Sequence, residues 1–382
     1  MANQYQMFKV HVDRDATLER LGQVFDSGFI NEGEQVAELN SALQKRLGVE
    51  RLTLVNAGTS ALTLALRIAG VGPGTNVVST PMTCIASNTP IINLGGDIIW
   101  ADVDPASGMV TVDTIAAKIN AQTKAVMMVD WAGVPAELEA LDAECQKQGV
   151  KLIQDAAHAF GAEYSGRPIA DFADFTCYSF QAIKHFTCGD GGALACRDEA
   201  DYALAKKLKW FGYDREKAKD EKGNWRGQQA GADIYPEEVG YKFNMNNVSA
   251  AIGLTQLQHI DEILERHRAN ALTYDKIFSA YNTLHPIKRP KGSNPSFWVY
   301  TVLLQEGGQA RDALLTELSA KGIHAGVVHV PNDDYSAFAS CKADLPGVRH
   351  FASHQLSLPC GWWLEQSDIE HIGTTLIDLL HN

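Results

Sequence analysis

Three short segments carry side chains that could do chemistry, and the first contains Asp155. The residue lies in KLIQDAAHAFGAE, at the carboxyl end of a run that is hydrophobic enough to form a buried strand. In an open α/β sheet, this edge is where ligands bind. The carboxylate could anchor a cation, bind a metal, or cap a helix that begins at Ala156 and Ala157.

Lys184 is the second candidate, in YSFQAIKHFTCGDGGAL, where it follows a predicted strand and precedes a glycine-rich turn. Burial in a partly desolvated pocket lowers the pKa of a lysine and makes its amine a nucleophile that attacks aldehydes. Most lysines are solvated, so this position alone assigns no role. His185 would point away from Lys184 in an extended backbone, and its closeness in sequence says little.

The third segment is NAGTSALTLAL, residues 56–66, where a strand is predicted to end and a helix to begin near Ser60. Free N–H groups at a helix N-terminus, together with the hydroxyls of Thr59 and Ser60, form a phosphate site that needs no net positive charge. Simple capping of the helix is the alternative interpretation.

Taken together, the three segments supply the parts that hold pyridoxal phosphate (PLP): an anion cradle, an amine nucleophile, and a carboxylate that pairs with a ring N–H. The phosphate is predicted to lie on Thr59 and Ser60, with Ser179 as a further donor. Asp155 would keep the pyridine nitrogen protonated. Lys184 would bond to the cofactor aldehyde and, once an amino donor displaces it, move the proton between the donor carbon and the cofactor.

These groups need a sheet to position them, and short β-branched runs alternate with helical segments between Leu52 and about Cys196. The sequence predicts strands at residues 76–79, 97–100, 125–129, 151–154, 175–178 and 193–196. It predicts helices at residues 60–69, 85–94, 112–119 and 138–148, with Gly95 and Gly149 ending two of them. The expected class is α/β, with a mostly parallel sheet of about six strands.

A smaller lobe is expected towards the C-terminus. Apolar residues at mixed three and four spacings predict one long connecting helix at residues 247–281. A strand at 297–304 and helices at 310–321 and 369–380 then predict a large domain of residues 1–255 and a small α+β domain of residues 256–382. The polar, glycine-bearing stretch at residues 215–233 has no periodicity and is predicted to be a loop.

Charge and hydropathy exclude several classes of function. With 33 Lys and Arg against 46 Asp and Glu, the net charge is −13, so the chain has no large basic field for nucleic acid or an anionic membrane. The sequence contains no stretch as apolar and long as a membrane span, and its N-terminus lacks a signal-peptide core, so we expect a cytoplasmic protein. Seven cysteines without a CxxC pair predict reduced thiols, and no metal site is expected.

With these segments in view, the sequence resembles the sugar aminotransferases of the DegT/DnrJ/StrS family. The resemblance is carried by NAGTSAL, GVGPGTNVVSTPMTCIASNTPI, DVDPASG, the segment from QDAAHAFGAE to CGDGGAL, VGYKFNMNNVSAAIGLTQL and LSLPCGWW, in family order over most of the chain. It implies a type I PLP-dependent transferase fold, with a large, mostly parallel domain and a smaller C-terminal α+β domain. It also implies an obligate homodimer in which both subunits line each active site.

The resemblance implies roles for individual residues of the cofactor site. Lys184 is the Schiff-base lysine and Asp155 is the partner of the pyridine nitrogen. Thr59, Ser60 and Ser179 are the phosphate ligands.

Further positions follow the family less closely. His158 falls beside the phenolic oxygen of the cofactor, where the family usually has glutamine or histidine. Cys84 stands where an aromatic residue often covers the pyridine ring, and Lys242 stands where an asparagine of the neighbouring subunit often reaches the phosphate. The segment HAGVVHVPNDDY matches the sugar end of the pocket and contributes His329, Asn332 and Tyr335.

The function implied is transfer of an amino group from L-glutamate to a nucleotide-linked keto sugar, with the cofactor cycling between PLP and pyridoxamine phosphate (PMP). The products would be 2-oxoglutarate and an amino sugar for a polysaccharide or a secondary metabolite. Relatives that dehydrate sugars carry a histidine in place of the lysine, so Lys184 counts against a dehydratase.

Two further classes of protein are disfavoured. A regulator with this fold would carry a DNA-binding module, for which the N-terminal segment is too short and insufficiently basic. An NAD-dependent dehydrogenase is disfavoured because GVGPG, residues 70–74, follows a helical run and leads into a strand, the reverse of a dinucleotide-binding loop. Trp362 and Trp363 could line a substrate pocket or lie half in the core.

Overall fold

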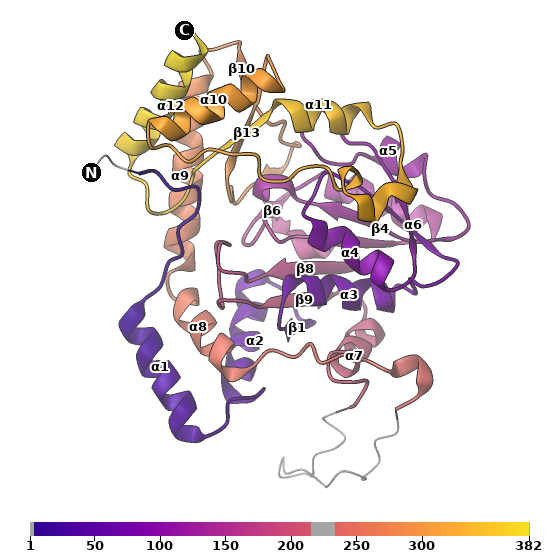
Figure 1. Ribbon diagram of the computed structural model, residues 1–382. Helices are drawn as coiled ribbons and strands as arrows, with labels where there is room; N and C mark the ends of the chain where they lie inside the picture. The colour runs from indigo at the N-terminus through magenta and orange to yellow at the C-terminus, as the bar shows by residue number, and fades with distance from the viewer. Residues whose placement is uncertain (1–3, 215–233, 382) are drawn as a thin grey trace.

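A seven-stranded sheet forms the centre of the larger lobe in the computed structural model, which describes residues 4–214 and 234–381 (Figure 1). The predicted loop at residues 215–233 lies outside the described residues. In spatial order the strands are β1 (Leu52–Val55), β9 (Gly192–Cys196), β8 (Phe175–Ser179), β5 (Lys151–Asp155), β4 (Thr123–Val129), β2 (Asn76–Ser79) and β3 (Asp97–Trp100).

Five of these strands, from β8 to β3, run parallel, and β9 is antiparallel to both of its neighbours. Most strand residues are buried on both sides, which is why the runs are apolar without alternation. The predicted α/β class with a mostly parallel sheet is confirmed, and the six predicted strands are present within two residues at their ends.

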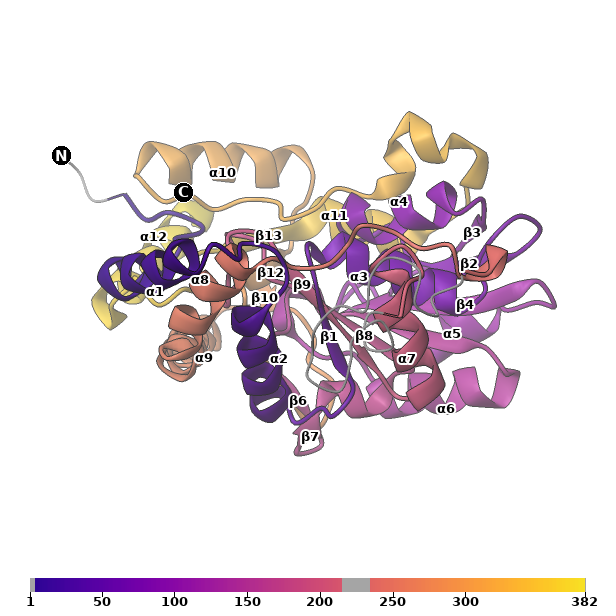
Figure 2. The ribbon, with the colours of Figure 1, turned by 90° about the horizontal axis from the view of Figure 1, so that it is seen from below.

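Helices lie on both faces of the sheet (Figure 2). On one face α3 (Gly58–Ile68) contacts α4 (Ile85–Asn93), and on the other α5 (Val112–Ala116) contacts α6 (Leu138–Gln148). Right-handed crossovers require this division, because the chain steps outwards from β2 to β3 and then returns through β4 to β5. Gly149 ends α6 as predicted, in the left-handed conformation at φ +68°. Helix α5 is shorter than the predicted 112–119, because residues 117 and 118 form a turn.

Three further helices complete the large lobe: α1 (Arg14–Ser27), α2 (Glu34–Leu47) and α7 (Glu199–Leu208). None of them was predicted. Helix α2 buries Val36, Leu39, Leu43 and Leu47, a helical spacing that the sequence does display.

The predicted helix at residues 247–281 is two helices, α8 (Asn247–Leu257) and α9 (Ile260–Phe278). Helix α8 packs between α1 and α2 and is buried on several sides, whereas α9 has one buried stripe and packs against α12 (Gln366–Leu380). The two buried surfaces do not share one continuous stripe, so the helix breaks at Gln258 and His259.

The small lobe is built on a second, antiparallel sheet of β10 (Leu284–Pro286), β12 (Tyr300–Leu304) and β13 (Gln355–Leu358). Helices α10 (Gln309–Ala320), α11 (Pro346–His354) and α12 accompany it. The strand predicted at 297–304 begins only at Tyr300, because Phe297 has φ +51° and residues 296 and 298 bond to the loop after β4. The remaining short elements are β6 (Glu163–Tyr164), β7 (Arg167–Pro168), β11 (Ser293–Asn294) and the 3-10 turns at Trp131–Gly133, Ile169–Phe172, Pro236–Glu238, Asn332–Asp334 and Ser336–Cys341.

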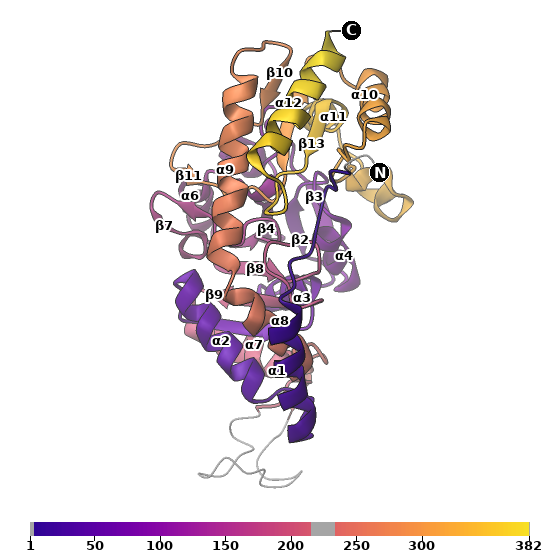
Figure 3. The same ribbon diagram turned by 90° about the vertical axis from the view of Figure 1, so that its left-hand side faces the viewer.

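The chain has two hydrophobic cores: a larger one around the central sheet, which also takes in Val348 and Phe351 of α11, and a smaller one within the small lobe. The larger takes in Ile260 to Leu264 at the start of α9, and the smaller begins at Ala271 in the same helix. Helix α9 therefore joins both cores, and the domain boundary at residues 255 and 256 stays a prediction. The N-terminal segment passes from the small lobe, where Tyr5 pairs with Ile323, down to α1 (Figure 3).

Candidate active site

The carboxyl edge of the central sheet gathers the predicted cofactor residues. Asp155 ends β5 and Ser179 ends β8, on neighbouring parallel strands. Gly192, at the start of the antiparallel strand β9, pairs with both Ser179 and Val55, the last residue of β1. This register brings the chain that leaves β1, and with it the start of α3, to the same edge.

The N-terminus of α3 lies directly against Ser179. A Cβ on Gly58 would stand 2.8 Å from the Ser179 Cβ, and a Cβ on Gly192 would stand 2.7 Å from the Gly58 nitrogen. Only glycine permits this approach. Thr59 is exposed, and Ser60 is buried with its hydroxyl donating to Asn56 Oδ1 at 2.7 Å. Free N–H groups and hydroxyls therefore meet at one helix start, the arrangement that binds phosphate.

Asp155 is buried and held in place by two donors. Ser87 Oγ donates to Oδ2 at 2.6 Å, and the Ala157 N–H donates to Oδ1 at 3.0 Å. Thr83 lies 2.8 Å from the Ser87 hydroxyl and extends the network. Burial raises the pKa of Asp155, and these two hydrogen bonds together with the charge of Lys184 oppose that rise.

Lys184 lies in the loop between β8 and β9, half-buried, with Nζ 3.6 Å from the ring centroid of Trp298. Burial lowers the pKa of Lys184 to about 8, while the charges of Asp155 and Cys84 act in the opposite direction. The charges of Lys184 and Asp155 act on one another, so the two side chains lie near each other. A lysine with this pKa keeps an appreciable neutral fraction near neutral pH.

His158 and His329 lie together beside Lys184. Their rings are stacked at 5.3 Å between centroids, with the two Nε2 atoms 3.4 Å apart. His158 also stacks on Trp298 at 4.1 Å, and Trp131 meets both imidazoles edge-on. Burial lowers the pKa of His158 far below its usual value and that of His329 to about 3, so both rings are neutral.

The remaining predicted residues occupy different surroundings. Cys84 precedes α4 and is half-buried. The Nζ of Lys242 contacts Asn244 Oδ1 and lies 3.5 Å from the ring centroid of Trp210, and its backbone carbonyl lies 3.4 Å from Asn56 Nδ2 beside the start of α3.

Asn332 and Tyr335 differ sharply in exposure. The Asn332 side chain is buried, accepting from Asn88 Nδ2 and donating to the Thr83 carbonyl, both at 2.8 Å. It ties the loop before α4 to the small lobe. Tyr335 is exposed at the mouth of a shallow cavity that Arg349 also lines.

Trp362 and Trp363 line a narrow cavity together with Lys184, Trp298 and Phe8. Their indole nitrogens donate to the carbonyls of residues 9 and 6, both at 3.2 Å. These bonds hold the N-terminal segment beside the lysine, and a role of the pair in a substrate pocket stays a prediction.

Sequence reasoning missed three residues of this region. Ser87 and Trp298 contact Asp155 and Lys184 across long sequence separations, which no local pattern displays. Asp130 directly follows β4, as Asp155 ends β5, so the strand-end criterion could have found it. Its carboxylate accepts from Gln154 Nε2 at 2.7 Å and from the Ala136 N–H, and burial raises the pKa of Asp130 to about 7.

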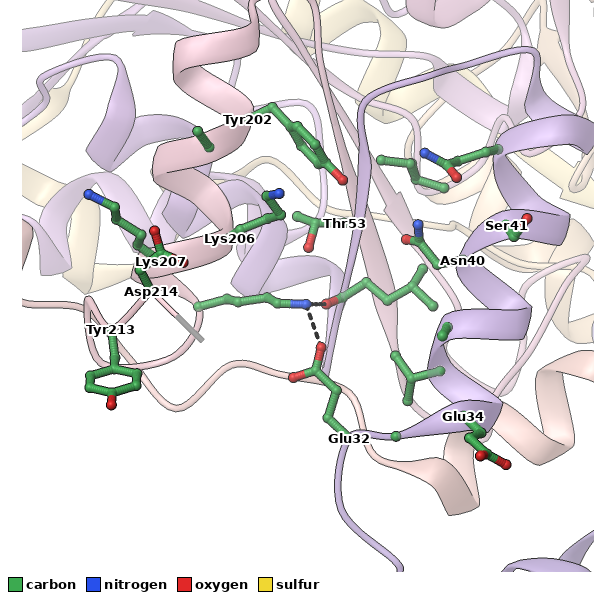
Figure 4. Close-up of a pocket in the computed structure, with 18 residues that line it drawn as sticks. Glu32, Glu34, Asn40, Ser41, Thr53, Tyr202, Lys206, Lys207, Tyr213 and Asp214 are labelled. Atoms are coloured by element: carbon green, nitrogen blue, oxygen red, sulfur yellow. Dashed lines mark hydrogen bonds and ion pairs between the residues drawn. The ribbon is translucent and has the colours of Figure 1, made fainter. Parts of the chain in front are cut away.

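A cavity of about 680 Å³ lies elsewhere, across the edge strand β1 between α2 and α7 (Figure 4). Lys209 crosses it, with Nζ donating to Glu32 Oε1 at 2.8 Å and to the Leu54 carbonyl. The predicted site residues do not line this cavity.

Within residues 4–214 and 234–381, no cluster of His, Cys, Asp and Glu side chains has the arrangement of a metal site. In the same part of the chain, no helix is both long and apolar enough to cross a membrane. All seven cysteines are free thiols, as predicted.

The donor set fits PLP. Gly58 lets the start of α3 lie against Ser179, so the N–H groups of the helix start and the Ser179 hydroxyl are close enough to bind one phosphate, and Asp155 supplies an oriented, buried carboxylate. His158 Nδ1 is buried and has no hydrogen-bond partner within the described protein, so it is available to a ligand. Lys184 supplies the amine.

Comparison with known proteins gives concordant results. Residues 12–377 match the DegT/DnrJ/EryC1/StrS aminotransferase family. The crystal structure of AtS13 from Actinomadura melliaura is similar at 36% identity and a TM-score of 0.91, covering 99% of each chain. The sugar aminotransferase CalS13 from Micromonospora echinospora is similar at 34% identity and a TM-score of 0.89, covering 97% of this chain and 99% of that one. The aminotransferase TlmJ from Streptoalloteichus hindustanus is similar at 28% identity and a TM-score of 0.89, covering 99% of each chain.

Proposed function

The chain belongs to the DegT/DnrJ/EryC1/StrS aminotransferase family and is a PLP-dependent sugar aminotransferase, and on that premise we propose that it moves an amino group from L-glutamate to a nucleotide-linked keto sugar. The observation that carries the proposal is the convergence of Asp155, Lys184 and the α3 N-terminus at one sheet edge. The products would be 2-oxoglutarate and an amino sugar.

We assign the cofactor contacts to residues at this edge. Thr59, Ser60 and Ser179 hold the phosphate, with the N–H groups that begin α3. Asp155, oriented by Ser87, holds the proton of the pyridine nitrogen. When bound, PLP supplies an aldehyde that carries the amino group and a ring that withdraws electrons from the donor carbon.

Lys184 is the residue that moves the proton. Once the donor amine has displaced it, its Nζ would accept the proton of the donor carbon and would pass it to the cofactor carbon that carried the aldehyde. Because burial lowers the pKa of Lys184 to about 8, the amine gives up its proton more readily than a solvated lysine does.

The two neutral imidazoles, of His158 and His329, line the site on the side of the small lobe. His158, with its unpartnered Nδ1, is proposed to contact the phenolic oxygen of the cofactor, and His329 is proposed to contact the sugar. We place Cys84 against the cofactor ring and Tyr335 at the sugar end of the pocket. The buried Asn332 would act by fixing the loop that leads to Cys84.

We further propose a homodimer with shared active sites, in which Lys242 of each subunit reaches the phosphate of the other. In the isolated chain Nζ of Lys242 contacts Asn244 and Trp210, beside the start of α3. Exposed apolar residues on the first helix and the turn after it, Leu18, Phe25, Phe29 and Ile30, support burial of this side against a second copy.

The test is a screen of nucleotide-linked keto sugars with L-glutamate, followed by identification of the aminated product by mass spectrometry and NMR. We expect stoichiometric 2-oxoglutarate with one sugar class and none with the Lys184→Ala variant. A wild-type protein that binds PLP but whose visible spectrum does not respond to L-glutamate would contradict the glutamate assignment.

A further inference from the structure

Two hydrogen bonds join residues 296–298 to the residues on either side of Lys184, one to the Ile183 carbonyl and one to the His185 side chain. Trp298 Nε1 donates to the carbonyl of Ile183 at 2.7 Å, and His185 Nε2 lies 3.0 Å from the carbonyl of Ser296. Residues 296–298 therefore hold the lysine segment both before and after Lys184, although they lie more than a hundred residues away in sequence.

The ring of Trp298 also touches the lysine side chain itself. Lys184 Nζ lies 3.6 Å from the ring centroid, inside the range of a cation–π contact. The indole is 3% exposed and stacks on His158 at 4.1 Å and on Phe8 at 4.8 Å. Packed in this way, the ring has no room to turn, so it offers the amine a fixed surface.

Residues 296–298 hold a conformation that costs energy. Phe297 has φ +51°, and Ala132 in the adjoining loop has φ +57°. The strain is compensated by paired backbone bonds, from Ser296 N–H to the Gly133 carbonyl and from Trp298 N–H to the Ala132 carbonyl. Strain of this kind persists where the surroundings determine the geometry, and it gathers at functional sites.

We propose that Trp298 is a positioning residue for Lys184: its ring face orients the amine, and its indole N–H fixes the peptide that precedes the lysine. This inference rests on the proposed role of Lys184 in binding the cofactor. It assigns Trp298 an action on bond formation, in which Nζ attaches to the aldehyde carbon of PLP and the aldehyde oxygen leaves as water. It assigns Trp298 no part in binding the phosphate.

The experiment separates attachment from binding in the apoenzyme. The rate at which PLP becomes covalently bound is followed by stopped-flow absorbance. The affinity for 4-deoxypyridoxine 5′-phosphate, which has the phosphate and ring but no aldehyde, is measured by calorimetry. Substituting a residue that positions the amine changes the rate of covalent attachment. It leaves the affinity for 4-deoxypyridoxine 5′-phosphate within about twofold, a difference below about 0.5 kcal/mol.

Two substitutions divide the contributions of Trp298. Trp298→Phe keeps a ring face and removes the donor, and it is expected to slow attachment about threefold to tenfold, the effect of one hydrogen bond. Trp298→Leu removes both and is expected to slow attachment by more than about tenfold. Trp100→Phe, which alters a buried indole at the end of the outermost strand β3, serves as the matched control and should change neither quantity.

The outcomes are distinct. The inference is overturned if PLP attaches to Trp298→Leu at the wild-type rate. It is also overturned if Trp298→Leu loses attachment rate and affinity for 4-deoxypyridoxine 5′-phosphate equally, because that would show a general structural role. If Trp298→Leu does not fold, Trp298→Phe decides by the same two measurements. If PLP does not attach to Lys184 in the wild-type protein, the proposed function is overturned instead.

Discussion

Burial acts in opposite directions on the two ionisable groups at the site. It lowers the pKa of Lys184 to about 8 and raises that of Asp155, and the charge of each group favours the charged form of the other. The pair therefore stays partly charged although Asp155 is buried and Lys184 is half-buried. Trp298 and Ser87 fix where each charge lies, so the chemistry assigned to the pair depends on neighbours that the sequence does not display next to them.

The lowered pKa of Lys184 predicts the pH dependence of cofactor attachment to the apoenzyme. Below pH of about 8 the amine is mostly protonated and unreactive, and above it the amine is mostly neutral. The attachment rate should therefore rise with pH and level off above pH of about 8. Stopped-flow absorbance over a pH series measures this profile. A rate that keeps rising as it does for a solvated lysine would contradict the assignment.

Ser87 provides a second prediction at the scale of single residues. Its hydroxyl donates to Asp155 Oδ2 at 2.6 Å, and a hydrogen bond to a charged group contributes about 1.5–3 kcal/mol. Ser87→Ala should slow the half-reaction with L-glutamate by about tenfold or more, and should leave attachment of PLP to Lys184 nearly unchanged. Single-turnover kinetics measure both.

Ser79→Ala is the matched control for Ser87→Ala, because Ser79 is equally buried and donates to the neutral Asn88 Oδ1 at the same distance of 2.6 Å. If Ser79→Ala and Ser87→Ala slow the half-reaction equally, Ser87 does not act through Asp155.

At the scale of elements, the start of α3 depends on a steric condition. Gly58→Ala places a methyl group 2.8 Å from the Ser179 Cβ, so the helix must move away from the phosphate position. We expect PLP to lose most of its affinity advantage over pyridoxal, which has no phosphate, while the fold is retained. Binding titrations with the two compounds measure this ratio.

Gly72→Ala is the control for Gly58→Ala, since the nearest atom to a Cβ there is the Leu94 carbonyl oxygen, at an ordinary contact distance of 3.8 Å. It should leave the ratio of PLP affinity to pyridoxal affinity unchanged. A Gly58→Ala protein that still prefers PLP over pyridoxal as strongly as wild type would refute the phosphate site at α3.

The elements that carry Asp155 and Lys184 were predictable because both residues follow buried, apolar strands whose ends define a sheet edge. Positions that depend on tertiary context were not. The helix break at His259 arises from different packing partners of α8 and α9, and the late start of β12 arises from the positive φ of Phe297. Trp298 and Ser87 belong to the same class, because their roles come from contacts that form only after folding.

At the scale of the whole molecule, the proposed sharing of sites between subunits predicts complementation. Lys184→Ala and Lys242→Ala proteins, each of low activity alone, are refolded or co-expressed together to form mixed dimers. If Lys242 serves the partner's site, each mixed dimer has one site with both lysines intact, and activity is restored. If Lys242 serves its own subunit, no intact site forms.

Assays of activity against mixing ratio, with mixed dimers isolated by two affinity tags, measure this restoration. Isolated mixed dimers with no more activity than the Lys242→Ala parent would contradict the shared site. Within one chain, the Lys242 ammonium contacts Asn244 and Trp210.

The role of Lys184 as the attachment point of the cofactor is tested most directly by reducing the PLP-loaded protein with borohydride, digesting it, and mapping the modified peptide by mass spectrometry. We expect one phosphopyridoxyl group per chain, attached to Lys184, and no such group in Lys184→Ala. Attachment to another lysine, or none in a protein that retains bound PLP, would contradict this role.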